Sequence, residues 1–227
     1  MDSIRENLKR VQERIAEAAL RSGRRPEEVR LVGATKGVPP ERILEAVEAG
    51  LDTIGENYVQ EAQRKYEIIG GRVKWHMIGR LQTNKAKHAV RLFEVIHSLS
   101  SLKLALELQK RAEREGRRIR VLVQVNLSGE ETKAGVSPEG LPELIRTVLG
   151  MSNLEVSGLM TMPPYSEDPE NSRPFFRRLR ELRDRLSEEG IILPELSMGM
   201  SNDYEVAVEE GATMVRIGTA IFGPRSR

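Results

Sequence analysis

A lysine stands just beyond a short apolar run, where a strand of a parallel sheet would end. The run covers residues 31–34, and Lys36 follows it after one threonine. An amine at a strand end can be shielded from water, and shielding favours the neutral form, which is the nucleophile that makes a Schiff base with an aldehyde. A solvated lysine is the simpler interpretation, so Lys36 needs support from other residues.

Two segments rich in glycine and hydroxyl groups follow the last two predicted strands. They are residues 197–201, Ser-Met-Gly-Met-Ser, and Gly218-Thr219. In barrels of alternating strands and helices, the loops after strands seven and eight often bind phosphate. We also expect Ser201 to cap a helix that begins near Asn202, which would add a helix N-terminus to the anion site. Each segment alone is explained as well by a turn and a helix cap.

Taken together, the lysine and the two loops predict a ligand that carries an aldehyde at one end and a phosphate at the other. Pyridoxal 5′-phosphate (PLP) fits this description, and the phosphosugar substrate of a Schiff-base aldolase fits it less tightly. Arg216 precedes Gly218 by two residues. It either faces the ring of the same ligand or forms a salt bridge inside the fold, and the spacing favours neither interpretation.

The elements that must position these residues alternate regularly along the chain. Eight short apolar strands are predicted at 30–34, 53–54, 73–78, 92–96, 119–125, 156–159, 195–196 and 213–217. Amphipathic helices are predicted between them near 40–49, 57–67, 83–89, 101–115, 138–149, 170–189 and 202–210. Several of these helices end in a glycine directly before the next strand: Gly50, Gly116, Gly190 and Gly211. Such glycines are typical of the loops that join a helix to a strand.

The predicted fold class is α/β, a modified (β/α)8 TIM barrel with an extra N-terminal helix. That helix covers 2–22, where apolar residues recur at spacings of three and four. A doubly wound open sheet is the competing architecture. It usually carries a glycine-rich G-x-G-x-x-G turn after the first strand, whereas residues 34–40 read Ala-Thr-Lys-Gly-Val-Pro-Pro.

Composition excludes several classes of protein. The chain has 227 residues, 36 Lys plus Arg, 34 Asp plus Glu, three His and no Cys. The absence of Cys rules out disulfides, thiolate metal sites and a cysteine nucleophile. A net charge of +2 argues against a nucleic-acid-binding protein. With no run near the roughly 20 apolar residues of a membrane helix, we expect one cytoplasmic domain over 1–227 with no membrane contact.

Two other groups of residues receive a structural interpretation. His76, His88 and His97 lack the spacing of metal ligands, so no metal site is predicted, and we expect His76 to be hydrogen-bonded inside the fold. The arginine-rich stretch 173–185 contains apolar residues at helical spacing. It is interpreted as an amphipathic helix with a solvated basic face.

The chain resembles the PLP homeostasis protein family (PLPBP), which consists of single-domain PLP-binding proteins. The resemblance runs from about residue 30 to the C-terminus. The segments that carry it are 32–36, 55–61, 75–85, 96–98, 125–128, 133–135, 158–162, 197–201 and 215–223. They include Gly-Glu-Asn-Tyr-Val-Gln-Glu at 55–61 and Ile-Gly-Arg-Leu-Gln-Thr-Asn-Lys at 78–85.

This resemblance implies a barrel similar to the N-terminal domain of alanine racemase, fold type III of PLP proteins. It implies a Schiff base between PLP and Lys36, with Asn57 beside the cofactor. It also implies that the phosphate is held by Ser201, Gly218 and Thr219, and that Arg216 faces the pyridine nitrogen. The family is regarded as a non-enzymatic carrier or regulator of PLP supply that influences amino-acid and keto-acid balance.

The chemistry of the predicted site agrees with a protein that holds PLP without catalysis. PLP is a stronger electron sink when its ring nitrogen is protonated, and a cationic Arg216 would oppose protonation. Racemases of this fold take a second acid/base from another domain, and this chain ends soon after the eighth strand. We therefore expect no catalytic residue, a monomer, and PLP-dependent apoenzymes as partners. A weak racemase-like or decarboxylase enzyme and a phosphosugar aldolase remain the alternatives.

Overall fold

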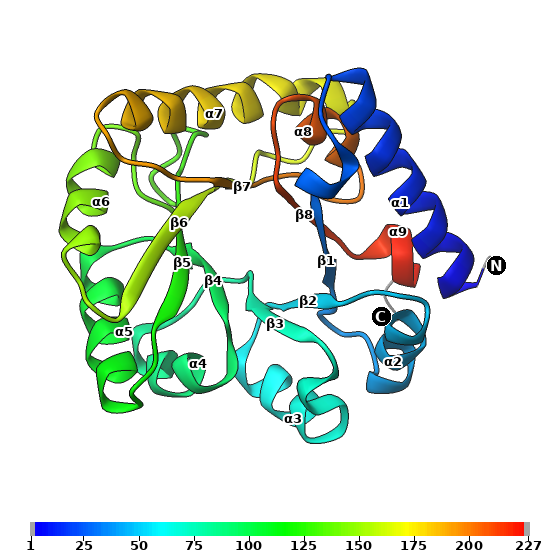
Figure 1. Ribbon diagram of the computed structural model, residues 1–227, viewed down its shortest axis with the longest axis horizontal. Coiled ribbons are helices and arrows are strands. Elements are labelled where there is room, and N and C mark those ends of the chain that lie inside the picture. Colours follow the sequence, from blue (N-terminus) through cyan, green and yellow to red (C-terminus); the bar gives the residue numbers. More distant parts are fainter. Residues whose placement is uncertain (1–2, 225–227) are drawn as a thin grey trace.

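The computed structural model describes residues 3–224, which form eight parallel strands closed into a barrel in chain order (Figure 1). The strands are β1 (Arg30–Ala34), β2 (Thr53–Glu56), β3 (Lys74–Met77), β4 (Val95–Leu99), β5 (Ile119–Gln124), β6 (Leu154–Met160), β7 (Glu195–Ser197) and β8 (Met214–Ile217). Residues 30–33 of β1 pair with residues 214–217 of β8. This pairing confirms the predicted TIM barrel and shows that the open-sheet alternative was wrong.

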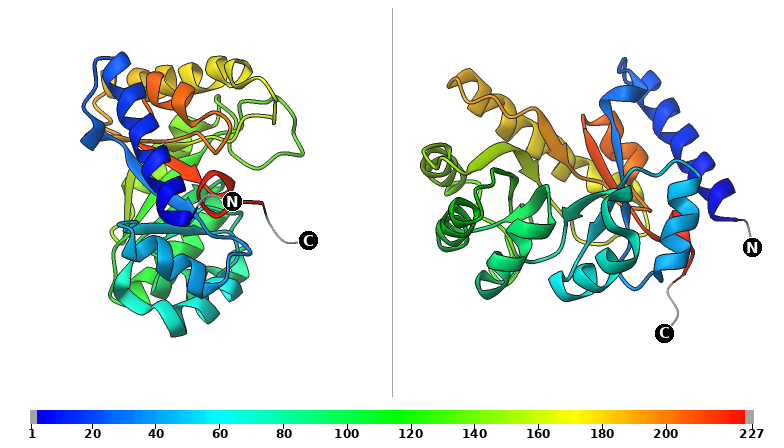
Figure 2. Two further views of the ribbon diagram at one scale, coloured as in Figure 1. Left: turned by 90° about the vertical axis from the view of Figure 1, so that its right-hand side faces the viewer. Right: turned by 60° about the horizontal axis from the view of Figure 1, so that its bottom comes forward.

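Helices surround the strands on the outside of the barrel (Figures 1 and 2). They are α1 (Ile4–Arg21), α2 (Pro40–Glu48), α3 (Val59–Ile69), α4 (Ala86–Leu92), α5 (Leu102–Arg114), α6 (Leu141–Leu149), α7 (Arg173–Glu188), α8 (Tyr204–Glu209) and α9 (Thr219–Phe222). Short 3-10 helices cover Pro26–Glu28, Gly70–Arg72, Thr83–Lys85 and Pro169–Ser172. The four glycines predicted to end helices all have positive φ angles, which L side chains rarely adopt.

The predicted extra N-terminal helix is present as α1. Its start is fixed by a capping box, in which Ser3 accepts from the amide of Glu6 and Glu6 accepts from the amide of Ser3. Its buried apolar stripe lies against α8, α9 and α2. A hydrogen bond of 3.0 Å from Asn7 to the carbonyl of Ile221 ties α1 to the segment that follows the last strand.

The fourth strand was predicted three residues too early. The structure places β4 at Val95–Leu99, because α4 continues to Leu92 and the fully buried Phe93 closes the helix end. His97 therefore lies inside the strand and not after it. The last helix, α9, was not predicted, since four residues are too few to show a hydrophobic period.

Most of the apolar core lies between the strands and the surrounding helices, and two small clusters are separate from it. One consists of Val32, Ile78 and Met214, and the other of Val95, Leu122 and Met160. These residues alternate along their strands with residues of the main core, so they point into the barrel. The interior also holds fully buried polar side chains, which belong to the site described below.

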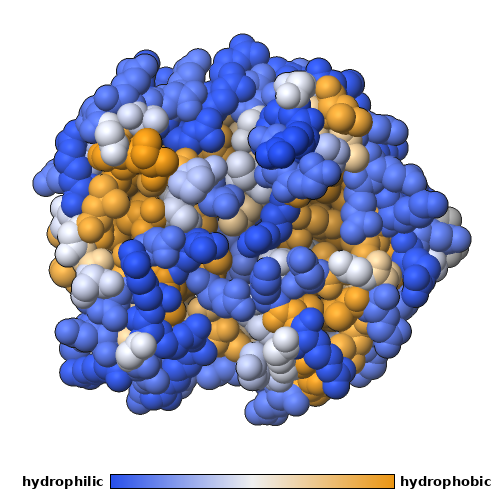
Figure 3. Space-filling model, in the orientation of Figure 1, coloured by the Kyte–Doolittle hydropathy of each residue, from blue (hydrophilic) through white to orange (hydrophobic). Residues whose placement is uncertain are grey.

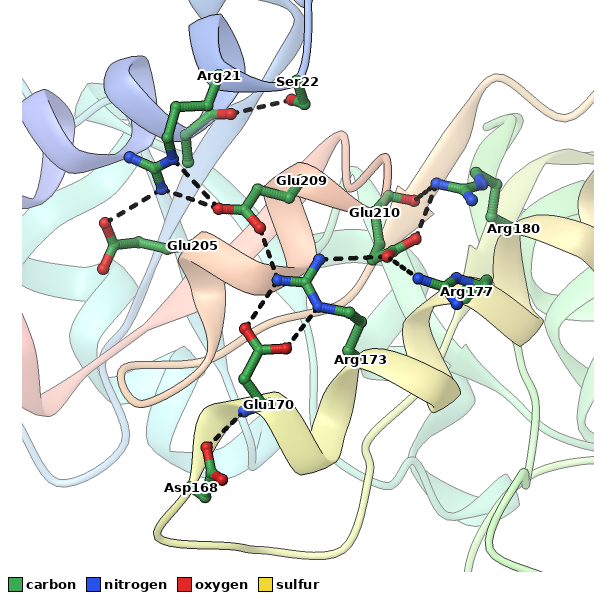
Figure 4. Close-up of polar contacts among 11 residues, drawn as sticks. Arg21, Ser22, Asp168, Glu170, Arg173, Arg177, Arg180, Glu205, Glu209 and Glu210 are labelled. Atoms are coloured by element: carbon green, nitrogen blue, oxygen red, sulfur yellow. Dashed lines mark hydrogen bonds and ion pairs between the residues drawn. The ribbon is translucent and has the colours of Figure 1, made fainter.

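The predicted amphipathic helix of the arginine-rich stretch is α7, but its basic face is only partly solvated (Figure 4). Arg173, Arg177 and Arg180 all form ion pairs with Glu210, and Arg173 also binds Glu209 at 2.7 Å. Burial alone would raise the pKa of Glu210, whereas the hydrogen bonds from Arg177 and Arg173 lower it. The arginines of α7 thus fasten it to the end of α8.

The face seen in Figure 3 is hydrophilic over most of its area, with hydrophobic stretches in recesses between charged side chains. Among residues 3–224, no helix has both the length and the apolar character needed to cross a membrane. The long connection after β5 projects from one end of the barrel (Figure 2, left). It is held by Asn126, whose side-chain amide donates to the carbonyls of Glu130 and Lys133.

Replacing Gly158 with alanine is expected to destabilise the barrel by about 3 kcal/mol or more. The new Cβ would lie 2.0 Å from the carbonyl oxygen of Glu195. That oxygen belongs to the backbone of β7, so the clash cannot be relieved by a side-chain rotation. The matched control is Gly150→Ala, whose Cβ would meet nothing closer than 3.4 Å. Denaturant unfolding should place the control within about 1 kcal/mol of wild type. Equal stabilities for the two variants would contradict the packing of β6 against β7.

Candidate functional site

The residues singled out in the sequence lie at the ends of four consecutive strands. Lys36 follows β1, Asn57 follows β2, Ser201 follows β7, and Arg216 lies in β8. Because β8 pairs with β1, the order around the barrel is β7, β8, β1, β2. The closed barrel therefore brings together strand ends that lie at opposite ends of the sequence, at the rim where barrel proteins carry their sites.

Lys36 stands in a turn just beyond the last hydrogen bond between β1 and β2. The amide of Thr35 donates to the carbonyl of Gly55 at 3.0 Å, and the amide of Val38 then closes the turn on the carbonyl of Thr35. The Lys36 side chain is half-buried, and its Nζ lies 5.2 Å from the ring centroid of Tyr58. The amine thus emerges at the rim and reaches from the end of β1 to the segment after β2.

The loops after β7 and β8 are joined by one hydrogen bond. Ser201 Oγ accepts from the backbone amide of Ala220 at 3.1 Å, which leaves the Ser201 hydroxyl hydrogen free to donate. The prediction that Ser201 caps the helix near Asn202 was wrong, because α8 begins at Tyr204 after Asp203. Ser201 instead binds an amide at the start of α9, which is distant in the sequence. This choice of partner depends on how the two loops pack and could not be predicted from the local sequence.

Gly218 brings this pair of loops against β1. A Cβ at Gly218 would lie 3.1 Å from the carbonyl oxygen of Ala34, so any larger residue would push β1 and the loop apart. Thr219 follows at the start of α9 and is exposed at the rim. The joined loops therefore offer two hydroxyl groups and a close backbone approach one strand away from Lys36. Hydroxyl donors beside a closely approaching backbone suit an anion.

Arg216 is buried in the barrel interior, with 2% of its surface exposed. Its guanidinium donates to Ser197 Oγ at 2.5 Å and to the carbonyl of Thr161 at 3.0 Å. No carboxylate among the described residues lies within ion-pair distance, so the salt bridge considered from the sequence was wrong. Burial lowers the pKa of Arg216 to about 10, which still leaves a cation at neutral pH.

The partners of Arg216 form a directed chain of hydrogen bonds across the barrel. A guanidinium only donates, so Ser197 Oγ accepts from Arg216. No other acceptor for the Ser197 hydroxyl lies among the described residues, so the hydroxyl donates to His97 Nδ1, 2.8 Å away. His97 Nε2 then donates to His76 Nδ1 at 2.9 Å. The expectation of a hydrogen-bonded interior His76 is confirmed. Its Nε2 atom has no partner among the described residues.

Both histidines of this chain are held neutral. Burial, assisted by nearby cations, lowers the pKa of His76 to about 3. Burial, His76 and Arg216 lower the pKa of His97 as well. Neutral rings are required by the chain itself, because each must accept a hydrogen bond on Nδ1. The histidines therefore orient Ser197, and Ser197 orients Arg216.

Asn57 lines a cavity that begins where β2 ends. The cavity has a volume of about 370 Å³ and is lined by Asn57, Tyr58, Val59, Gln60, Met77, Arg80, Leu81, Gln82 and Lys85. Neither Arg80 nor Lys85 forms an ion pair within the described part of the chain, so the cavity is lined by two cations and no carboxylate. Tyr58, the neighbour of Asn57 in the chain, lines the same cavity and has its ring 5.2 Å from Lys36 Nζ.

Sequence reasoning missed several buried polar residues of this region. Ser197 and His97 lie in the segments 197–201 and 96–98 that carry the resemblance, but the sequence gave neither residue a role of its own. Glu56 and Lys65 form a buried ion pair of 2.7 Å behind the end of β1. Burial raises the pKa of Glu56 to about 7, although Lys65 acts in the opposite direction. Glu56 lies in the quoted segment 55–61, which was the available signal.

Comparison with known proteins identifies relatives over nearly the whole chain. The family model described as the alanine racemase N-terminal domain matches residues 1–226. A pyridoxal phosphate homeostasis protein from Aquifex aeolicus is 54% identical over 222 residues, which cover 97% of each chain.

Solved structures give the same result. PipY from Synechococcus elongatus, solved with PLP bound, is 36% identical, and the match covers 94% of this chain and all of PipY with a TM-score of 0.83. An alanine racemase from Clostridium difficile shares the fold at 17% identity and a TM-score of 0.75. The match covers 95% of this chain and 56% of the racemase.

We predict that His76 and His97 stay neutral between pH 5 and 8, in the tautomers given by the hydrogen-bond chain. Their folded-state pKa values lie below the ordinary value of 6.5, so their contribution to stability is complete above that pH and is lost as the pH falls. Nitrogen-15 NMR of the imidazoles measures both properties. A ring that gains a second N–H within this range would contradict the chain.

Proposed function

This chain belongs to the pyridoxal phosphate homeostasis protein family, and we propose that it holds PLP at the mouth of its barrel as a Schiff base on Lys36. The observation that carries this proposal is the order of strand ends, β7, β8, β1 and β2. It puts the Lys36 amine and the hydroxyl groups of the loops after β7 and β8 on neighbouring strands. A ligand with an aldehyde at one end and a phosphate at the other could bind the amine and the loops at the same time.

The proposed phosphate site consists of Ser201, Gly218 and Thr219. The Ser201 hydroxyl has a hydrogen to donate because its oxygen already accepts from Ala220. The fit is supported by the close approach of Gly218 to β1, where an added Cβ would lie only 3.1 Å from the carbonyl oxygen of Ala34. Loops after strands seven and eight, followed by a short extra helix, are the usual phosphate site of barrel proteins, and α9 is such a helix.

The proposed role of Arg216 is to face the pyridine nitrogen. Ser197 and the carbonyl of Thr161 account for two of its N–H groups, and a guanidinium has five. Its partners are neutral, so its positive charge is not cancelled nearby. A cation at that position disfavours protonation of the ring nitrogen. PLP supplies electron-sink chemistry when its ring is protonated, and Arg216 would keep that chemistry weak.

We therefore propose a non-enzymatic role, in which the protein binds PLP and contributes to PLP homeostasis. The name of the Aquifex aeolicus relative and the PLP bound to PipY support this role. Asn57 is proposed to lie beside the cofactor, next to the aromatic ring of Tyr58. PLP-dependent apoenzymes are the proposed recipients of the cofactor, and a monomer is the proposed form.

Lys36→Ala is expected to abolish the visible absorption band that wild-type protein shows with PLP, without unfolding the barrel, because the Schiff base needs that amine. Borohydride reduction followed by peptide mass spectrometry should find the pyridoxyl group on Lys36 of the wild type. Lys85→Ala is the matched control, since Lys85 lines the cavity beside Asn57. It should keep the band. A label on Lys85, or a band that survives in Lys36→Ala, would relocate the site.

Ser201→Ala and Thr219→Ala should each weaken PLP retention while leaving the Schiff base intact. Each variant removes one hydrogen bond to a charged group, worth about 1.5–3 kcal/mol, or roughly 10- to 150-fold in affinity. Equilibrium dialysis against PLP measures the loss, and the absorption band reports the Schiff base. Wild-type retention in the double variant would show that the phosphate lies elsewhere.

A further inference from the structure

Two side chains of α3 grip the backbone on either side of Lys36. Lys65 Nζ donates to the carbonyl oxygen of Thr35 at 2.6 Å. Glu61 Oε1 accepts from the backbone amide of Gly37 at 2.7 Å. Thr35 and Gly37 are the neighbours of Lys36 in the chain, so both peptide groups that flank the lysine are fastened to one helix.

The two gripping side chains are also bound to each other. Lys65 Nζ donates to Glu61 Oε1 at 2.7 Å, one helical turn away on α3. The contacts thus close a ring that runs from Thr35 through Lys36 and Gly37 to Glu61 and back through Lys65. We call Glu61 and Lys65 the α3 clamp. A ring of contacts holds its members more firmly than separate bonds do, because each bond limits the freedom of the others.

The amine of Lys65 is buried and is bound by several groups of the protein. Its side chain is 6% exposed, and Nζ lies 2.7 Å from Glu56 Oε1 as well as from Glu61. Nζ donates hydrogen bonds to the carbonyl of Thr35 and to Glu61, and it is also paired with Glu56. Three oxygens of the protein thus surround the Lys65 amine inside the fold. Its contacts make it a support for the neighbouring Lys36 and not a rival nucleophile.

The backbone at Lys36 needs such a support. The bond from Thr35 to Gly55 is the last between β1 and β2, and the chain then turns through Gly37 at a φ of +71°. Lys36 thus lies outside the regular sheet, in a turn whose two flanking peptide groups are bound by the α3 clamp. If the loops after β7 and β8 hold the phosphate end of a ligand, the position of its aldehyde end is fixed as well. The Lys36 amine must then lie at that position, because covalent bond formation depends strongly on preset geometry.

We propose that Glu61 and Lys65 are positioning residues that hold the backbone of Lys36 so that its amine meets the aldehyde of a ligand anchored at Ser201, Gly218 and Thr219. This inference rests on the proposed function of Lys36. The α3 clamp acts on Schiff-base formation only, and it leaves phosphate and ring contacts unchanged. That separation can be measured with two ligands that differ only at the reacting carbon.

The test compares PLP with pyridoxine 5′-phosphate, which carries an alcohol in place of the aldehyde and forms no Schiff base. Glu61→Ala removes the acceptor for Gly37, and Glu61→Gln keeps an oxygen there. Glu61 is the residue to change because its side chain is 19% exposed, whereas removing Lys65 would strand the buried Glu56. Glu67→Ala is the matched control, being an exposed glutamate on the same helix.

Glu61→Ala should weaken PLP binding by about 10-fold or more and change pyridoxine 5′-phosphate binding by less than about 2-fold. Glu61→Gln should recover most of the loss, and Glu67→Ala should match wild type with both ligands. Circular dichroism and denaturant unfolding confirm that every variant is folded before titration. The Schiff-base band and calorimetry give the two affinities.

Three results would overturn the inference. An unchanged PLP affinity in Glu61→Ala would show that the α3 clamp does not matter for the lysine. An equal loss for both ligands would show a general structural role. Wild-type protein without a Schiff base at Lys36 would remove the proposed function itself, and borohydride labelling of the wild type identifies that case separately.

Discussion

Closure of the sheet between β1 and β8 is the constraint on which the candidate site depends. The register of this pair sets Val32 opposite Arg216 and Gly33 opposite Ile217. It therefore fixes how far the end of β8 lies from the end of β1. The approach of Gly218 to Ala34, which brings the loops after β7 and β8 close to the end of β1, crosses this seam. A sheet left open at the same place would put these residues on opposite edges.

The barrel interior contains a chain of hydrogen-bonded polar side chains, and burying such groups costs desolvation free energy. Arg216, Ser197, His97 and His76 replace apolar contacts by a series of hydrogen bonds that starts at the guanidinium, which can only donate. The cost is reduced because the histidines are neutral and only one group carries a charge. The result is a cation with a fixed orientation near the carboxyl end of the strands. Such preorganisation is what a binding site for a planar ring requires.

The two buried basic residues of this region have opposite surroundings. Lys65 lies between the carboxylates of Glu56 and Glu61 and is used entirely within the fold. Arg216 has only neutral partners and N–H groups to spare. Lys36 has neither kind of partner and lies at the rim over Tyr58. Their partners thus indicate a different role for each side chain. Lys65 supports the backbone, Arg216 is a candidate ligand contact, and Lys36 is a candidate nucleophile.

The sequence by itself determined the fold class, the extra helix α1 and the residues that end most strands, because apolar periodicity and glycine caps are local signals. It also determined that Lys36 and the loops at 197–201 and 218–219 belong to one rim, since strands of a barrel run parallel. Tertiary structure alone decided that Ser201 reaches Ala220, that Arg216 binds Ser197 and Thr161, and that α3 grips both sides of Lys36. Each of these contacts joins residues from different strands or helices. Their geometry depends on register and helix packing, which no local pattern of residues encodes.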